Sequence, residues 1–136
     1  MKMKRMIALV LVLMLATLGA AQAATVLTGK AQSVVNQVNQ ERAKRGLSTL
    51  RVDPTLTAAA QKRAMEIVQK FSHTRPDGTK WSTVSSKAYA ENIAMGQKTA
   101  DKVMAAWLTS SGHRANILRA SYGSIGVACV KSGNVY

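Results

Sequence analysis

The N-terminal segment has the three-part layout of a secretory signal peptide. Basic residues within the first five positions are followed by an uninterrupted apolar run over residues 6–18, and Ala21-Gln22-Ala23 fits the small-x-small rule for cleavage. The apolar run is shorter than the roughly 20 residues that span a membrane as a helix, which favours removal over an uncleaved anchor. We therefore expect residues 1–23 to be removed on export and no transmembrane helix to remain.

Removal of this leader leaves 113 residues, which is enough for one domain with a single core. No internal repeat or linker divides residues 24–136, so we expect one domain there. Cys129 is the one cysteine of the chain, so no internal disulfide can form. It lies in the apolar run of residues 125–130, where a small buried hydrophobe is its expected role. An intermolecular disulfide and a catalytic thiol are the alternatives.

The chain is strongly basic, with a formal net charge of +13. The leader holds three of the 19 basic residues and none of the six acidic ones, so the remainder carries +10. Such a charge favours anionic partners, above all a cell-envelope surface. The basic residues are scattered, however, and a generally solvated basic surface would give the same count. Nucleic acid is not expected, because the chain is predicted to be exported and shows no nucleic-acid motif.

Helical patterns occupy most of the chain before a C-terminal strand. Asp53-Pro54 has the N-cap and first-position chemistry of a helix start, and Gly46 stands where a helix end favours a left-handed residue. β-Branched residues predict a buried strand over residues 125–130, and a second strand begins near Asn134. This order indicates an α+β domain. The segments with helical spacing are residues 30–45, the helix from Asp53, residues 100–110 and a turn over residues 113–118.

The side chains that could support chemistry are few. The two histidines are His73, in a polar loop, and His113, after a predicted helix. Glu91 stands among small and apolar residues, which suggests a carboxylate drawn toward the interior. Two neutral imidazoles and a carboxylate would suffice as a zinc shell completed by water, or as an acid/base set without metal. The alternative is a purely structural hydrogen-bond network.

Three segments resemble the signature blocks of bacterial members of the CAP superfamily, the cysteine-rich secretory, antigen 5 and pathogenesis-related 1 proteins. They are His73 followed by Arg75-Pro76-Asp77-Gly78, the segment Glu91-Asn92-Ile93-Ala94, and the block from Trp107 to Leu118 that reads W-x-x-S-x-G-H-R-x-N-I-L. The resemblance extends over about residues 34–136. It implies a three-layer α-β-α sandwich with a small antiparallel sheet. It also implies an aromatic-rich final strand beyond Tyr136, so the chain ends as a truncated domain would.

The resemblance implies a ligand-binding cleft with two histidines and two acidic residues, at which some members bind zinc or another divalent cation. By position, His73, His113 and Glu91 match three of the four, and they are the metal ligands that we expect. Ser110 stands at the position of the second acid, as in the bacterial pattern. A mechanism that needs two carboxylates is therefore not supported by these residues, and we assign no catalytic residue.

These observations favour a secreted, non-enzymatic binding module for a lipid-like molecule or an envelope ligand. The expected cofactor is a divalent cation, and zinc is the cation that we expect before any other. The alternative is a metal-assisted extracellular hydrolase that uses the same cleft, since proteolysis has been proposed for some members of the family that the chain resembles. Glu91 would then have to act as ligand or base. A third reading, a membrane-active basic protein, ranks last because no helix concentrates basic residues on one face.

Overall fold

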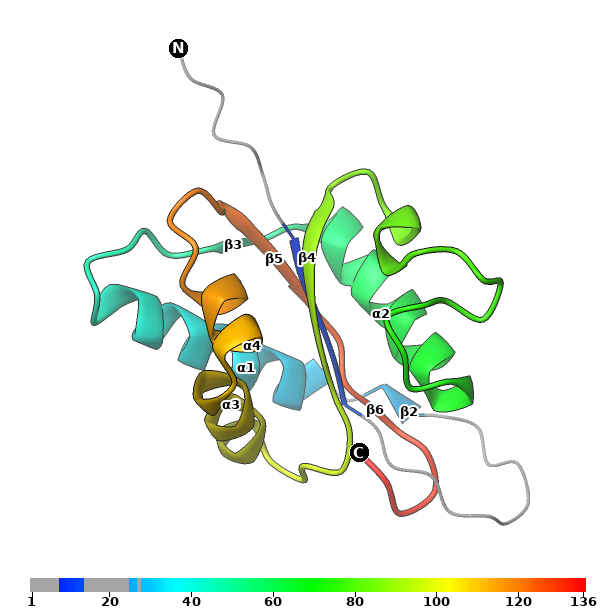
Figure 1. Ribbon diagram of the computed structural model, residues 1–136. Helices are drawn as coiled ribbons and strands as arrows, with labels where there is room; N and C mark the ends of the chain where they lie inside the picture. The colour runs from blue at the N-terminus through cyan, green and yellow to red at the C-terminus, as the bar shows by residue number, and fades with distance from the viewer. Residues whose placement is uncertain (1–7, 14–24, 27) are drawn as a thin grey trace.

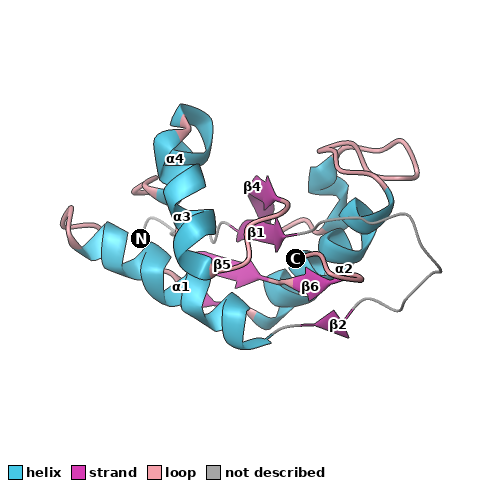
Figure 2. Ribbon diagram, turned by 90° about the horizontal axis from the view of Figure 1, so that it is seen from below, coloured by secondary structure: helices cyan, strands magenta, loops and turns pink. Residues whose placement is uncertain are grey.

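The computed structural model describes residues 8–13, 25–26 and 28–136, and the rest of the predicted leader lies outside the described residues. Helices on two sides enclose a central sheet (Figures 1 and 2). The elements, in chain order, are β1 (Ala8–Leu13), β2 (Thr25–Val26), α1 (Thr28–Ala43), β3 (Arg51–Val52), α2 (Pro54–Gln69), the 3₁₀ helix η1 (Trp81–Val84), β4 (Ala88–Ala94), α3 (Ala100–Thr109), α4 (Ser111–Ile117), β5 (Ser124–Val127) and β6 (Val130–Lys131).

The three layers separate α2 from the other helices. Helices α1, α3 and α4 lie on one side of the sheet, and α2 with η1 lies on the other (Figure 1). Helix α2 packs against β1 and β5, whereas α1 packs against α3 and β5. The α+β class and the layered arrangement therefore match the prediction. None of the helices in the described part of the chain combines the length and apolarity that a membrane crossing needs.

The sheet has the strand order β3-β5-β1-β4, and a separate pair joins β2 to β6. We expected a small antiparallel sheet, but among the described strands only β2–β6 is antiparallel. In the four-stranded sheet β1 runs parallel to both β4 and β5, and β3 runs parallel to β5. The difference arises because β1 enters from the N-terminal segment, and because a helix separates the other strands along the chain.

Helix α1 is fixed at its C-terminal end by a fully buried arginine. Arg42 donates hydrogen bonds to four backbone carbonyls, those of Ser48, Ile117, Arg119 and Tyr122, at 2.7–3.4 Å. Burial lowers the pKa of its guanidinium. These bonds connect α1 to the chain that follows α4. The helix then ends in a turn at Gly46, whose φ of 68° is the left-handed conformation predicted there.

Helix α2 begins where Asp53-Pro54 predicted. Asp53 Oδ1 accepts a hydrogen bond from the Leu56 backbone at 3.0 Å, and Pro54 occupies the first turn. This turn lies directly on β5 at Gly126. A Cβ atom there would lie 2.1 Å from the carbonyl carbon of Leu56, so only glycine allows this approach.

The later elements differ from their predicted bounds in three places. Helix α4 begins at Ser111, two residues before the turn expected over residues 113–118, and the expected strand over residues 125–130 is divided into β5 and β6. Near Asn134 the chain forms a turn with a single bridge between Ser132 and Val135 instead of a strand. Strand β4 was not predicted. Cys129 is a buried free thiol, as expected, and burial raises its pKa to about 11.

The close approach at Gly126 gives the first prediction. Gly126→Ala should force α2 away from β5 and lower the free energy of unfolding by at least about 2 kcal/mol, because the clash is with backbone that cannot rotate away. Gly123→Ala is the matched control, since a Cβ there meets nothing within 4 Å. Urea denaturation of both variants measures the difference. Equal unfolding free energies would show that α2 does not lie on β5 in this way.

Candidate functional site

Glu91 lies on β4 in the interior, and a buried arginine neutralises it. Arg63 of α2 donates from Nε to Glu91 Oε2 at 2.7 Å and from Nη2 to Glu91 Oε1 at 3.0 Å. The side chain of Arg63 is 0% exposed and that of Glu91 is 1% exposed. Burial alone would lower the pKa of Arg63, but its bonds to Glu91 outweigh burial, so the pKa lies above its usual value. The pair joins α2 to the sheet.

The same carboxylate orients His73. Nδ1 of His73 lies 2.9 Å from Glu91 Oε1. Because both carboxylate oxygens of Glu91 accept hydrogen bonds from Arg63, Glu91 is the acceptor here as well, and the proton of this bond is assigned to Nδ1 of the imidazole. Nε2 of a neutral His73 then carries a lone pair. The His73 side chain is 52% exposed, so the buried pair holds an imidazole that ligands can reach.

The loop that carries His73 is anchored on both sides. Arg63 Nη2 donates to the carbonyl of Ser72 at 2.7 Å, and the His73 carbonyl accepts from the Trp81 backbone at 2.9 Å. Further along, Arg75 donates from Nε to both carboxylate oxygens of Glu66 at 2.8 and 2.9 Å. The Arg-Pro-Asp-Gly segment therefore acts as a structural brace for the histidine.

His113 comes from the opposite side of β4, on α4 (Figure 1). Its Nδ1 lies 2.8 Å from Ser110 Oγ, and its ring is tilted 41° to that of Trp107 with 6.5 Å between ring centroids. Burial lowers the pKa of His113, and the electrostatic influence of the nearby His73 lowers it further. The two imidazoles therefore interact electrostatically, and His113 is neutral at neutral pH.

Two asparagines fix α4 to β4. Asn92 is fully buried and donates to the backbone carbonyl of His113 at 3.0 Å. Asn116 donates to Asn92 Oδ1 at 2.9 Å and approaches the Glu91 carbonyl at 3.4 Å. These amides set the position of His113 relative to Glu91.

The four predicted site residues form two separate contacts in the structure and do not surround one common point as metal ligands would. Glu91 contacts His73, and Ser110 contacts His113. Within the described residues, no three side chains of the histidine, cysteine, aspartate or glutamate type are grouped as a metal site would require. The three-ligand metal set of His73, His113 and Glu91 stays a prediction. The oxygens of Glu91, however, are already used by Arg63 and His73.

Arg63 is the site residue that sequence reasoning missed. Its signal was present, because Arg63 falls three residues after Ala60 and four before Ile67, on the apolar side of α2. A charged residue at a core position of a helix requires a buried partner, since an unpaired charge is rarely tolerated in a core. Glu91 was already suspected of being drawn inward, so the pair could have been inferred from the two observations.

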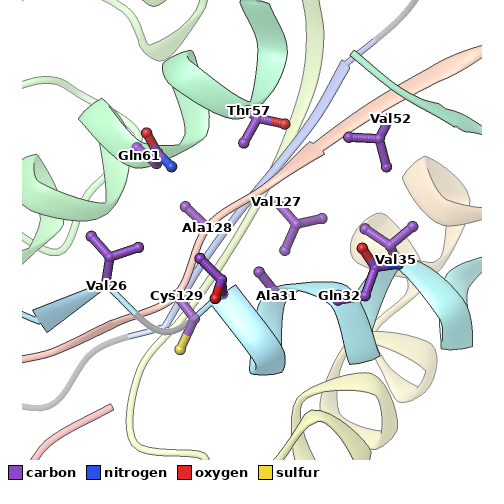
Figure 3. A pocket seen from close by; sticks show the side chains of 11 residues that line it. Val26, Ala31, Gln32, Val35, Val52, Thr57, Gln61, Val127, Ala128 and Cys129 are labelled. Atoms are coloured by element: carbon purple, nitrogen blue, oxygen red, sulfur yellow. The ribbon is translucent and has the colours of Figure 1, made fainter. Parts of the chain in front are cut away.

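A separate pocket of about 160 Å³ opens between α1, α2 and the end of β5 (Figure 3). Its lining is mainly apolar and includes Cys129 at one end, and Gln32 and Gln61 add amide groups. Neither histidine lines it. The pocket is lined by Val26, Thr28, Ala31, Gln32, Val35, Val52, Thr57, Gln61, Val127, Ala128 and Cys129.

Fold and site together define a three-layer α+β domain with a histidine held by a buried carboxylate–arginine pair. Residues 35–136 match the model of the cysteine-rich secretory protein (CAP) family, and the chain belongs to this family. It is also 40% identical over 113 residues to the uncharacterized protein YkwD of Bacillus subtilis (strain 168). The match covers 77% of this chain but 44% of that relative, so the chain spans less than half the relative's length. No solved structure matches the chain.

The Arg63–Glu91 pair gives the second prediction. Arg63→Met should lower the free energy of unfolding by about 3–5 kcal/mol, because it leaves a buried carboxylate without its charge partner. The double variant Arg63→Met/Glu91→Met should recover much of this loss, since no buried charge remains. Chemical denaturation of the single and double variants measures the recovery. Additive losses would mean that the two side chains do not depend on each other.

The lowered pKa of His113 gives the third prediction. His73→Ala should raise the pKa of His113 toward its ordinary value, because one of the two causes of the shift is removed. In the wild type, the free energy of unfolding should fall as the pH drops below about 6.5, since the unfolded chain then binds a proton that folded His113 resists. NMR titration of the imidazole protons checks the shift. A pKa of His113 above its usual value would contradict the geometry.

Proposed function

We propose that this chain is an exported binding module that presents His73 and His113 to a ligand or a divalent cation at the cell envelope. The observation that carries the proposal is the Arg63–Glu91–His73 chain of contacts. A fully buried ion pair costs desolvation, and here it fixes one half-exposed imidazole in a defined tautomer. Such an arrangement suits recognition, because the orientation of the acceptor nitrogen is set before the ligand arrives.

The residues of the site fit a divalent cation, but with the two histidines as ligands and Glu91 in a supporting role. Imidazole nitrogen is a ligand that zinc prefers, and metal-bound histidines commonly donate their other N–H to a carboxylate. His73 already makes that donation to Glu91. His73 and His113 would therefore hold the cation through Nε2, and Glu91 would act behind His73 instead of as a ligand. A bound zinc ion would polarise a water molecule or an oxygen of the ligand.

Charge and the separate pocket support the choice of partner. The net charge of +10 after leader removal favours an anionic envelope surface. The pocket beside Cys129 has mainly apolar walls, which suits a small apolar part of a lipid-like molecule (Figure 3). Export itself is proposed from the leader sequence.

Metal-assisted hydrolysis is the alternative, and Ser110 lies 2.8 Å from His113 in the manner of a nucleophile near a base. The hydrogen bonds that Glu91 already makes favour the binding function over hydrolysis. Hydrolysis needs a group that takes up and releases protons, and Glu91 accepts from three donors at once. If the hydrolase reading is correct, Glu91→Gln abolishes turnover in a folded protein, and undiminished hydrolysis by that variant would exclude it.

The fourth prediction tests the histidine pair with zinc as the probe. Wild-type protein purified without chelators should bind one zinc ion in native mass spectrometry and calorimetry, and His73→Ala/His113→Ala should bind none. Glu91→Gln should bind about 10–100-fold more weakly, because the orientation of His73 is lost. Glu41→Gln is the matched control, a carboxylate on α1 that pairs with Lys44 and Arg45 and lies outside the histidine site. Equal zinc affinity in the wild type and the double histidine variant would contradict the cation site.

A further inference from the structure

Another pocket, of about 560 Å³, opens where β3 and β5 begin. The two strands run parallel, with Arg51 beside Ser124, so the segments that precede them meet at this end of the sheet (Figure 1). One wall comes from the segment after α1 and the other from the segment after α4. The volume falls within the range of about 300–1,000 Å³ that is usual for small-molecule sites. No residue of the histidine site lines this pocket.

Hydroxyl groups and positive charge characterise the walls of this pocket. Arg51 is exposed and forms no ion pair among the described residues. The guanidinium of Arg119 lies 5.6 Å from the ring centroid of Tyr122, which places a second cation beside the pocket. None of the lining residues that the structure describes is acidic. The hydroxyl groups come from Ser48, Thr49, Ser121, Tyr122 and Ser124.

Two side chains of α1 hold the walls in place. Arg42 donates to the carbonyl of Ser48 on one wall and to that of Tyr122 on the other, at 2.7 and 3.4 Å. Asn39 accepts from the Leu50 backbone N–H at 2.7 Å and donates to the Leu50 carbonyl at 3.0 Å. Within the described part of the chain no carboxylate pairs with Arg42, so its charge adds to the positive potential of the pocket. Walls that are fixed in advance lose less conformational entropy when a ligand binds.

We propose that this pocket binds a sugar that carries an anionic group, a phosphate or a carboxylate. The hydroxyl groups of the walls exchange hydrogen bonds with those of the sugar, and Arg51 pairs with the anion, since a guanidinium donates in pairs to either group. An apolar ligand fits poorly, because the wall hydroxyls would lose water without gaining partners. A bare inorganic anion would leave these hydroxyls unused. The proposal goes beyond the histidine site and does not depend on it.

The test is an NMR titration of the ¹⁵N-labelled full chain with glucose 6-phosphate and with glucuronic acid. The backbone amides of residues 48–51 and 120–124 should shift. Arg51→Gln should weaken binding at least about tenfold, because the charge-assisted hydrogen bonds to the anion are lost. Lys62→Gln is the matched control, since it removes the same charge from an exposed position of α2 outside the pocket. His73→Ala/His113→Ala should bind as the wild type does, which separates this pocket from the proposed histidine site.

Two reference ligands separate the parts of the proposal. Glucose lacks the anion and inorganic phosphate lacks the hydroxyl groups, so each should bind more weakly than glucose 6-phosphate. Binding of one anionic sugar and not the other supports the proposal and identifies the anionic group. Equal affinity for glucose 6-phosphate and either reference ligand overturns it, as does equal binding by Arg51→Gln and Lys62→Gln. Shifts confined to the surroundings of His73 and His113, or no binding of either anionic sugar at millimolar concentration, also overturn it.

Discussion

The contact between Arg63 and Glu91 is the constraint on which the arrangement of the site depends. It joins the layer of α2 to the central sheet through two hydrogen bonds between fully buried charges. Arg63 also holds the carbonyl of Ser72, and Glu91 holds the ring of His73. One ion pair therefore fixes a helix, a strand and a loop. A hydrophobic pair would pack at lower desolvation cost but would leave His73 without an orienting partner.

Arg42 performs a comparable structural task on the other side of the sheet without a carboxylate. Its guanidinium is fully buried, and among the described residues it donates to four backbone carbonyls, two of which follow the end of α4. Carbonyl dipoles compensate a buried charge less completely than a carboxylate does, and the pKa of Arg42 is lowered by burial whereas that of Arg63 is raised. Between them the two arginines hold the segments from which His73 and His113 arise.

The sequence was most informative where local chemistry decides structure. Asp53-Pro54 opens α2 and Gly46 adopts positive φ, because each depends on neighbours a few residues away. Strand β4 was missed because Glu91 and Asn92 interrupt its apolar pattern, and both are buried through partners distant in sequence. The placement of His73 against Glu91 was expected from family resemblance, whereas Arg63 required attention to a charge on an apolar helix face.

The leader shows why an apolar run alone does not determine its structural role. A continuous apolar stretch is compatible both with the centre of a signal peptide and with a strand of a parallel sheet. The two roles differ in what the segment pairs with, and here its partner is strand β4. Its register places Val10 opposite Glu91 and Leu11 opposite Asn92. The strand that pairs with β1 is thus the strand that holds the carboxylate of the histidine site.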